Sequence, residues 1–170
     1  MKAVQIANTF IARHGREILL TNLAINKLVY YAQAESLRRT GCPLYDDPVE
    51  AWQYGPVERG VYFAFNRYGR NRITEPSGPT ATDPYSIGIV DDVADKYGKF
   101  SAFDLVRFSH REGSAWKAVY SPNEDREITN EAILASADGK ELPPETDTFS
   151  AAIDDVSKRW SNTFNILRNA

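Results

Sequence analysis

Hydrophobic residues in the C-terminal segment recur at three- and four-residue spacings, which is the period of an amphipathic α-helix. Residues 23–39 are instead hydrophobic on nearly every side, which is typical of a central helix that contacts several neighbours. The pattern therefore predicts a mainly α-helical fold, with a central helix over 23–39 and a C-terminal amphipathic helix over 149–168. The stripe of that last helix is formed by Phe149, Ile153, Val156, Trp160, Phe164 and Leu167.

Start and stop signals flank the predicted helices. The starts are Thr21 before 23–39, Pro56 in the first turn of 57–68, the capping pair Ser101 and Asp104 at 102–110, and Thr129 before 130–137. A left-handed residue is expected after the helical segments, at Gly15, Gly41, Gly69, Gly98, Gly113 and Gly139. These signals agree with the hydrophobic pattern, so we predict a compact multi-helix fold.

One short stretch has the alternation of a β-strand. Residues 49–54 alternate hydrophobic and polar positions, and the alternation stops at Gly55 and Pro56. Residues 126–128 or 72–74 are the candidates to pair with this strand. We therefore predict a minor, short strand pair around residues 49–54.

Composition limits the class of protein. A chain of 170 residues, 42% of them hydrophobic, can bury a core without metals or disulfides, and we expect one domain over 1–170. The 20 basic and 23 acidic residues give a net charge of −3, which argues against nucleic-acid binding and a polybasic membrane anchor. The single Cys42 excludes an internal disulfide and a multi-cysteine metal site. With no membrane-spanning stretch and no signal-peptide pattern, we expect a cytoplasmic protein.

Only residues 110–112 resemble a catalytic fragment. His110 and Glu112 match the H-x-E that begins the zinc deaminase signature, but no P-C-x-x-C follows, because Cys42 lies upstream. The chain has no G-x-S-x-G nucleophile elbow and no glycine-rich phosphate loop. We therefore expect a protein that is not an enzyme, with no catalytic residue, metal or cofactor. The alternatives are a Cys42–His110 pair, or an enzyme or nucleic-acid-binding phage protein that uses His110, Glu112 and an arginine cluster.

Several aromatic and polar residues are more specific than ordinary packing requires. They are Lys27, Leu28, Tyr30, Tyr31, Trp52, Tyr54, Gly55, Pro56, His110 and Trp116. Large aromatic side chains with polar tips are enriched in interfaces as well as in cores. The alternative to a binding role is that these residues join a small helical core, with Lys27 reaching solvent or forming an ion pair.

Taken in order, these residues resemble the SocA-like Panacea domain antitoxin family, which includes phage-associated proteins. Residues 21–33 are similar to the family's L-x-K-L-x-Y-Y-x-Q helix, and residues 41–46 to its G-x-P-L-F segment. Residues 49–57 carry its most specific block, and the motif blocks together lie within 5–135. The remaining matches are Leu105, His110, Trp116 and Ile128, where the family shows leucine, Thr-His, tryptophan and isoleucine.

The resemblance implies an antitoxin that neutralises a cognate toxin by binding it, usually with the toxin encoded alongside. One branch of the family instead acts as a proteolytic adaptor that delivers its toxin to an ATP-dependent protease. The family's toxins have very different folds, so neither the toxin nor the oligomeric state follows from the resemblance. We expect the motif residues to be mainly structural, and Trp52, Tyr54, Gly55 and Pro56 to act through the fold.

A toxin-binding surface is expected away from the shared motifs, since unrelated toxins require varied contacts. Residues 1–80 carry 10 basic and 7 acidic side chains, whereas residues 81–170 carry 10 basic and 16 acidic ones. An uneven surface can steer a charged partner, although a solvated helix face gives the same pattern. The first candidates are four arginines within fourteen residues, and the second are two aromatics of the C-terminal helix. These candidates are Arg59, Arg67, Arg70, Arg72, Trp160 and Phe164.

Overall fold

The computed structural model describes residues 1–140, 148 and 151–153. Its helices are α1 (Ala3–His14), α2 (Asn22–Thr40), α3 (Arg59–Phe65), the short 3-10 helix η1 (Asn66–Tyr68), α4 (Pro84–Tyr97), α5 (Ala102–Ser109), α6 (Ala115–Val119) and α7 (Asn130–Ala135). Its strands are β1 (Val49–Trp52), β2 (Gly55–Glu58) and β3 (Arg126–Ile128). The predicted mainly α-helical fold with a minor strand element is confirmed.

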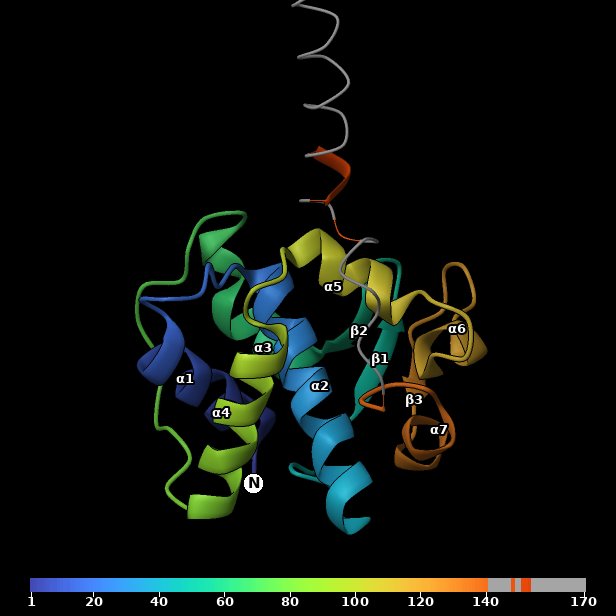
Figure 1. Ribbon diagram of the computed structural model, residues 1–170, viewed down its shortest axis with the longest axis horizontal. Helices are drawn as coiled ribbons and strands as arrows, with labels where there is room; N and C mark the ends of the chain where they lie inside the picture. Colours follow the sequence, from blue (N-terminus) through green and yellow to red (C-terminus); the bar gives the residue numbers. More distant parts are fainter. Residues whose placement is uncertain (141–147, 149–150, 154–170) are drawn as a thin grey trace, which may run out of the picture.

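Helix α2 is the centre of the fold. It lies between α1 and α4 on one side and the small sheet with α6 and α7 on the other (Figure 1). It contacts α1, α3, α4, α5, α7 and β2, and its side chains are buried almost from end to end. The predicted start is confirmed, because the Thr21 side chain accepts a hydrogen bond from the Ala24 backbone N–H. A helix that is hydrophobic on nearly every side is thus buried on nearly every side.

The sheet corrects two predictions about residues 49–68. Strand β1 ends at Trp52, and Gln53 and Tyr54 form a two-residue turn, since Trp52 pairs with Gly55. Gly55 and Pro56 then begin β2, so Pro56 does not open a helix. Residues 55–58 pair with β1 as strand β2, so helix α3 begins only at Arg59.

A carboxylate sets the start of α3. The Glu58 side chain accepts hydrogen bonds from the backbone N–H groups of Gly60, at 2.8 Å, and Val61, at 2.7 Å. These N–H groups have no partner within the helix, so a capping acceptor fixes the first turn. The sequence prediction took Pro56 as the start signal and missed this cap.

The third strand was one of two predicted alternatives. Strand β3 pairs antiparallel with β1, which gives the sheet order β2-β1-β3. Residues 72–74 do not pair with β1. Instead, the backbone N–H of the buried Ile73 donates to the carbonyl of Leu20 at 2.8 Å.

Helix ends agree with the prediction in part. The capping box of Ser101 and Asp104 at α5 and the Thr129 cap of α7 are confirmed. Helix α7 ends two residues earlier than expected, because the backbone at Ser136 is extended. Gly15 and Gly98 are right-handed, so the prediction was wrong there. Each continues the helical hydrogen bonding of the helix before it.

The C-terminal prediction falls mostly on residues that the structure does not describe. Residues 151–153 are helical, whereas the rest of the predicted helix 149–168, with Trp160 and Phe164, lies outside the described residues. None of the helices in the described part of the chain is long and apolar enough to cross a membrane.

Candidate functional site

The motif residues Lys27 and Gly55-Pro56 meet at one buried point. Lys27 on α2 is fully buried, and its Nζ donates to the carbonyl oxygen of Pro56 at 2.8 Å. Gly55 has φ +100°, and a Cβ there would lie 2.9 Å from Lys27 Cε and 2.5 Å from Ser109 Oγ. Only glycine fits this position, and the three residues together hold β2 against α2 and α5.

The environment of Lys27 differs from both sequence-based expectations. Its ammonium neither reaches solvent nor forms an ion pair with any residue in the described part of the chain. Burial lowers the pKa of Lys27 to about 7. A buried lysine without a carboxylate is favoured in its neutral form, which can still donate to a carbonyl. Lys27 therefore fills the space between α2 and the β1–β2 hairpin and donates a hydrogen bond to the Pro56 carbonyl.

His110 belongs to a stack of aromatic rings beside the same hairpin. Its ring lies parallel to that of Trp116, with centroids 3.7 Å apart, and Trp116 stacks in turn on Tyr120 at 4.4 Å. The Trp116 indole N–H donates to the backbone carbonyl of Trp52 at 2.7 Å. Burial, with the charges of Lys27 and Lys117, lowers the pKa of His110. His110 is therefore neutral when it packs against Trp116 at neutral pH. The stack joins α5 and α6 to β1.

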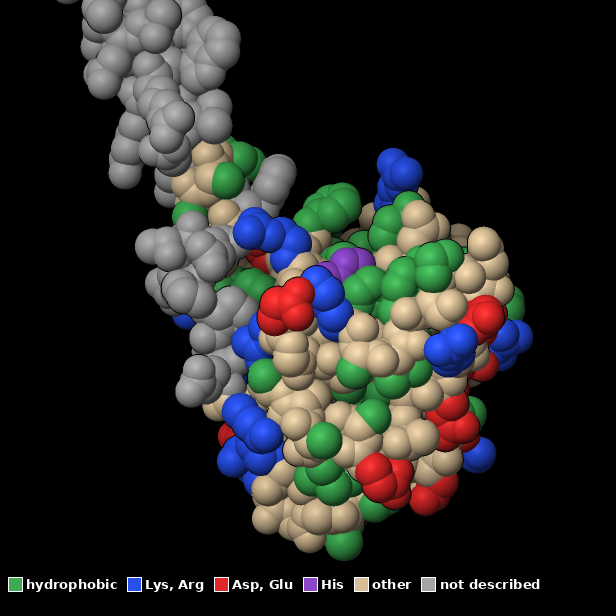
Figure 2. Space-filling model, turned by 90° about the vertical axis from the view of Figure 1, so that its right-hand side faces the viewer, with side chains coloured by type: hydrophobic (Ala, Val, Ile, Leu, Met, Phe, Trp, Pro, Cys, Tyr) green, Lys and Arg blue, Asp and Glu red, His purple; other side chains and the backbone are tan. Residues whose placement is uncertain are grey.

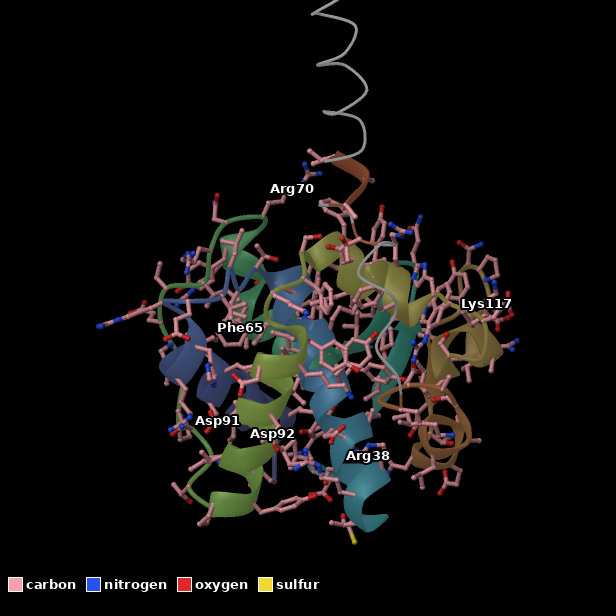
Figure 3. The ribbon with its side chains drawn as sticks, in the orientation of Figure 1. Arg38, Phe65, Arg70, Asp91, Asp92 and Lys117 are labelled. Carbon is pink, nitrogen blue, oxygen red and sulfur yellow. The ribbon has the colours of Figure 1, made fainter. Side chains whose placement is uncertain are left out.

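The side chains of His110 and Glu112 form no hydrogen bond with each other. Glu112 is 86% exposed at its side chain and pairs with Lys117 at 2.6 Å. His110 Nε2 is buried and has no hydrogen-bond partner among the described residues. The other histidine, His14, pairs with Asp91 at 2.8 Å, and Figure 3 shows Asp91 and Lys117 on opposite sides of the molecule. Within the described residues, no group of three histidine, cysteine or carboxylate side chains could hold a metal ion.

Sequence reasoning missed the partners of the motif tyrosines. The Tyr30 hydroxyl donates to Asp138 Oδ2 at 2.6 Å, and the backbone N–H of Ala115 donates to the same oxygen at 2.9 Å. Burial and this carboxylate raise the pKa of Tyr30 well above its usual value. Tyr31 stacks on Tyr97, with ring centroids 4.3 Å apart. Nothing local in the sequence marks Asp138 or Tyr97, because each contacts α2 from a distant part of the chain.

Gln33 explains why two motif blocks occur together. Its Oε1 accepts from the backbone N–H groups of Leu44, at 2.8 Å, and Tyr45, at 3.2 Å. Its Nε2 donates to the Tyr45 carbonyl and to Asn130 Oδ1. One side chain on α2 therefore fixes the segment after α2 and the start of α7.

The four candidate arginines do not form one basic surface. Arg59 pairs with Glu50 at 3.2 Å and Asp125 at 3.4 Å, which neutralises its charge. Arg72 donates to the carbonyl oxygens of Gly15 and Ile18, so it holds the turn after α1.

The other two arginines follow α3, with Arg67 in η1 and Arg70 in the turn after it. Arg67 lies over the ring of Tyr68, 5.0 Å from its centroid, and is 3.6 Å from Glu75. Arg70 is exposed and extends away from the body of the molecule (Figure 3). These two side chains are the part of the cluster whose charge faces solvent.

An aromatic surface lies on the hairpin and α3, and we define it as Trp52, Tyr54, Tyr62 and Phe63. The ring centroids of Trp52 and Tyr62 are 4.9 Å apart, and those of Tyr62 and Phe63 are 5.3 Å apart. Tyr54 is 63% exposed and Phe63 56% exposed. Figure 2, which faces the sheet and α6, shows hydrophobic side chains gathered in its upper half. Sequence reasoning named Trp52 and Tyr54 as structural and missed Phe63.

Replacing Trp52 with alanine should lower the free energy of unfolding by only about 1–2 kcal/mol. A fully buried tryptophan is worth about 3–5 kcal/mol, but Trp52 is half-buried and its indole N–H bonds the carboxylate of Glu50. Urea denaturation of the variant and the wild type measures the difference. A loss above about 3 kcal/mol would show that Trp52 is a core residue.

Comparison with known proteins gives the family. The model of the SocA-like antitoxin Panacea domain matches residues 25–117, which include Lys27, Gly55, Pro56, His110 and Trp116. The chain belongs to this antitoxin family. It is 31% identical over 116 residues to antitoxin SocA of Caulobacter vibrioides (strain NA1000 / CB15N). That match covers 61% of this chain and 61% of the length of the relative. No solved structure matches the chain.

Proposed function

We propose that the protein is a cytoplasmic antitoxin that neutralises its cognate toxin by direct protein–protein binding. The observation that carries the proposal is the family match over residues 25–117. Membership of an antitoxin family implies that the partner is a toxin. Neutralisation by binding needs an accessible surface rather than a catalytic site. The aromatic surface supports the proposal, since large exposed aromatic residues are enriched at protein interfaces.

The placement of the motif residues also favours a binding protein over an enzyme. Lys27 is fully buried and cannot reach a substrate, and Gly55 serves close packing. His110 and Glu112, the residues of the alternative enzyme hypothesis, have no hydrogen bond to each other and different surroundings. The motif thus supports a rigid scaffold, and the scaffold presents its exterior to a partner.

A growth-rescue experiment tests the proposal. Each reading frame adjacent to the gene is induced alone, and the one that arrests growth is co-expressed with this chain. We expect growth to recover, the two proteins to co-purify, and the Glu112→Ala variant to rescue as well as the wild type. If no neighbour arrests growth, or rescue occurs without a complex, the proposal is wrong.

The same assay separates direct inhibition from delivery to a protease. In a host that lacks its ATP-dependent proteases, a direct inhibitor still rescues growth and the toxin accumulates in the complex. Rescue that disappears in that host, with toxin levels restored, would assign the protein to the adaptor branch.

A further inference from the structure

We propose that the aromatic surface, together with Arg67 and Arg70, is the toxin-binding surface, and that it fits an apolar patch on the toxin surrounded by carboxylates. This inference rests on the proposed function and adds to it the place of the interface and the chemistry of the partner. The inference is based on the contact between the β1–β2 hairpin and α3, which Trp52 and Tyr62 make.

The exposure of the aromatic surface is the first argument. Tyr54 at the hairpin turn and Phe63 on α3 leave more than half of their surface in water. The Phe63 ring contacts Tyr62, and the Tyr62 ring contacts Trp52. Tyr54 follows Trp52 by two residues in the hairpin turn, so the hairpin and α3 together carry the exposed rings. Contiguous apolar groups of this kind on a soluble domain mark interaction sites.

The second argument is that the surface is held rigid from behind. The Trp116 indole N–H binds the carbonyl of Trp52, and Lys27 Nζ binds the carbonyl of Pro56, so both strands of the hairpin are fixed. The Trp52 indole N–H is itself held by Glu50 at 2.7 Å. Rigid aromatic side chains lose little conformational freedom on binding, which makes them effective anchors.

The third argument is the charge around the aromatic surface. Of the four arginines within residues 59–72, Arg67 and Arg70 are the two whose charge faces solvent. Arg67 lies in η1, four residues after Phe63, and its pair with Glu75 at 3.6 Å is open to solvent. Arg70 forms no ion pair with any residue in the part of the chain that the structure describes. An apolar centre with a positive edge complements an apolar patch with a negative edge. The toxin should therefore present aspartate and glutamate side chains to this edge.

Aromatic residues beside arginines also occur in proteins that bind single-stranded nucleic acid. Here Arg59, the arginine that lies over Trp52, is paired with two carboxylates, Glu50 and Asp125. The whole chain carries a net charge of −3. The cation beside this ring is therefore already neutralised and gives a nucleic-acid phosphate no charge partner next to the stacking surface, so the observations favour a protein partner.

Two pairs of variants test the inference, with the product of the adjacent growth-arresting gene as the probe. The Tyr54→Asp/Phe63→Asp variant places negative charge on the aromatic surface. The Arg67→Glu/Arg70→Glu variant reverses the charge at the edge of that surface. The matched controls are Leu134→Asp, an exposed hydrophobic residue on α7, and Lys99→Glu/Lys117→Glu, which changes the net charge equally. Circular dichroism confirms that each variant is folded, and Tyr54→Asp alone replaces the first variant if that variant unfolds.

Affinity is measured at low and at physiological salt. We expect a loss of about 100-fold for the aromatic variant and about 10-fold for the arginine variant, with the second loss larger at low salt. Both controls should bind within about twofold of the wild type. Growth rescue should fall in the same order.

The outcomes separate this inference from the proposed function. If the wild-type chain binds no toxin, the proposed function fails and the surface assignment fails with it. If the wild type, the aromatic variant and the controls bind equally well, the proposed function holds and only the surface assignment is overturned. A wild-type dimer that the aromatic variant disrupts, or binding of single-stranded RNA by this surface, would also overturn it.

Discussion

Replacing Gly55 with alanine should lower the free energy of unfolding by about 3 kcal/mol, the sum of backbone strain and overpacking. The backbone at Gly55 has φ +100°, which alanine adopts only with strain. Its Cβ would also meet Ser109 Oγ and Lys27 Cε, both in buried residues that have little room to move. In a chain of this length, the change corresponds to a fall of about 9 °C in Tm.

Gly41 supplies the matched control for this substitution. It also has positive φ, at +73°, but nothing lies within 4 Å of the position of a Cβ. Gly41→Ala should therefore show only the strain, about 1 kcal/mol. Thermal and urea denaturation of the two variants measure the difference. Equal losses would contradict the close packing of Gly55 against Lys27.

Lys27 should make the protein more stable as the pH rises from 7 to 9. Burial lowers the pKa of Lys27 to about 7 in the folded chain, whereas an unfolded lysine keeps its proton to about pH 10.4. Between these values the unfolded chain binds more protons, so stability rises with pH, by about 2 kcal/mol from pH 7 to pH 9. Below pH 7 both states are protonated and this contribution stays constant.

The Lys27→Met variant isolates this effect. Methionine keeps the length of the side chain and cannot titrate, so most of the rise between pH 7 and pH 9 should disappear. Lys96, whose pKa is also lowered by burial, contributes in both proteins and cancels in the comparison. The exposed Lys99→Met control should keep the wild-type rise. Parallel stability curves for the wild type and Lys27→Met would contradict a buried, titrating Lys27.

The parts of the fold that the sequence predicted well are those with local signals. The central helix α2 has a capping threonine before it, a long hydrophobic run within it and a glycine directly after it. The position of β2 depends instead on pairing with β1, a contact that the local sequence does not reveal. From the sequence alone, Pro56 is therefore predicted to begin a helix. Glycines 15 and 98 were misjudged because glycine permits a left-handed end but does not require one.

The site was less predictable, because its contacts join residues far apart in the chain. The motif marked Lys27 and Gly55 as unusual, but their contact and the role of Ser109 require the packing of α2, β2 and α5. The exposure of Phe63 depends on how α3 packs, with Val61 and Phe65 buried. The sequence places the start of this helix two residues early, at 57 rather than at Arg59. The role of Arg72 as a donor to the turn after α1 likewise has no local signature.

The direct measurement of the central claim is a titration of the purified toxin with this chain, followed by light scattering on the separated complex. Neutralisation by binding predicts a single complex of fixed stoichiometry, with free toxin disappearing in proportion to the protein added. Toxin activity should fall along the same line. Toxin inactivated by substoichiometric amounts of this chain, or without formation of a complex, would contradict the claim.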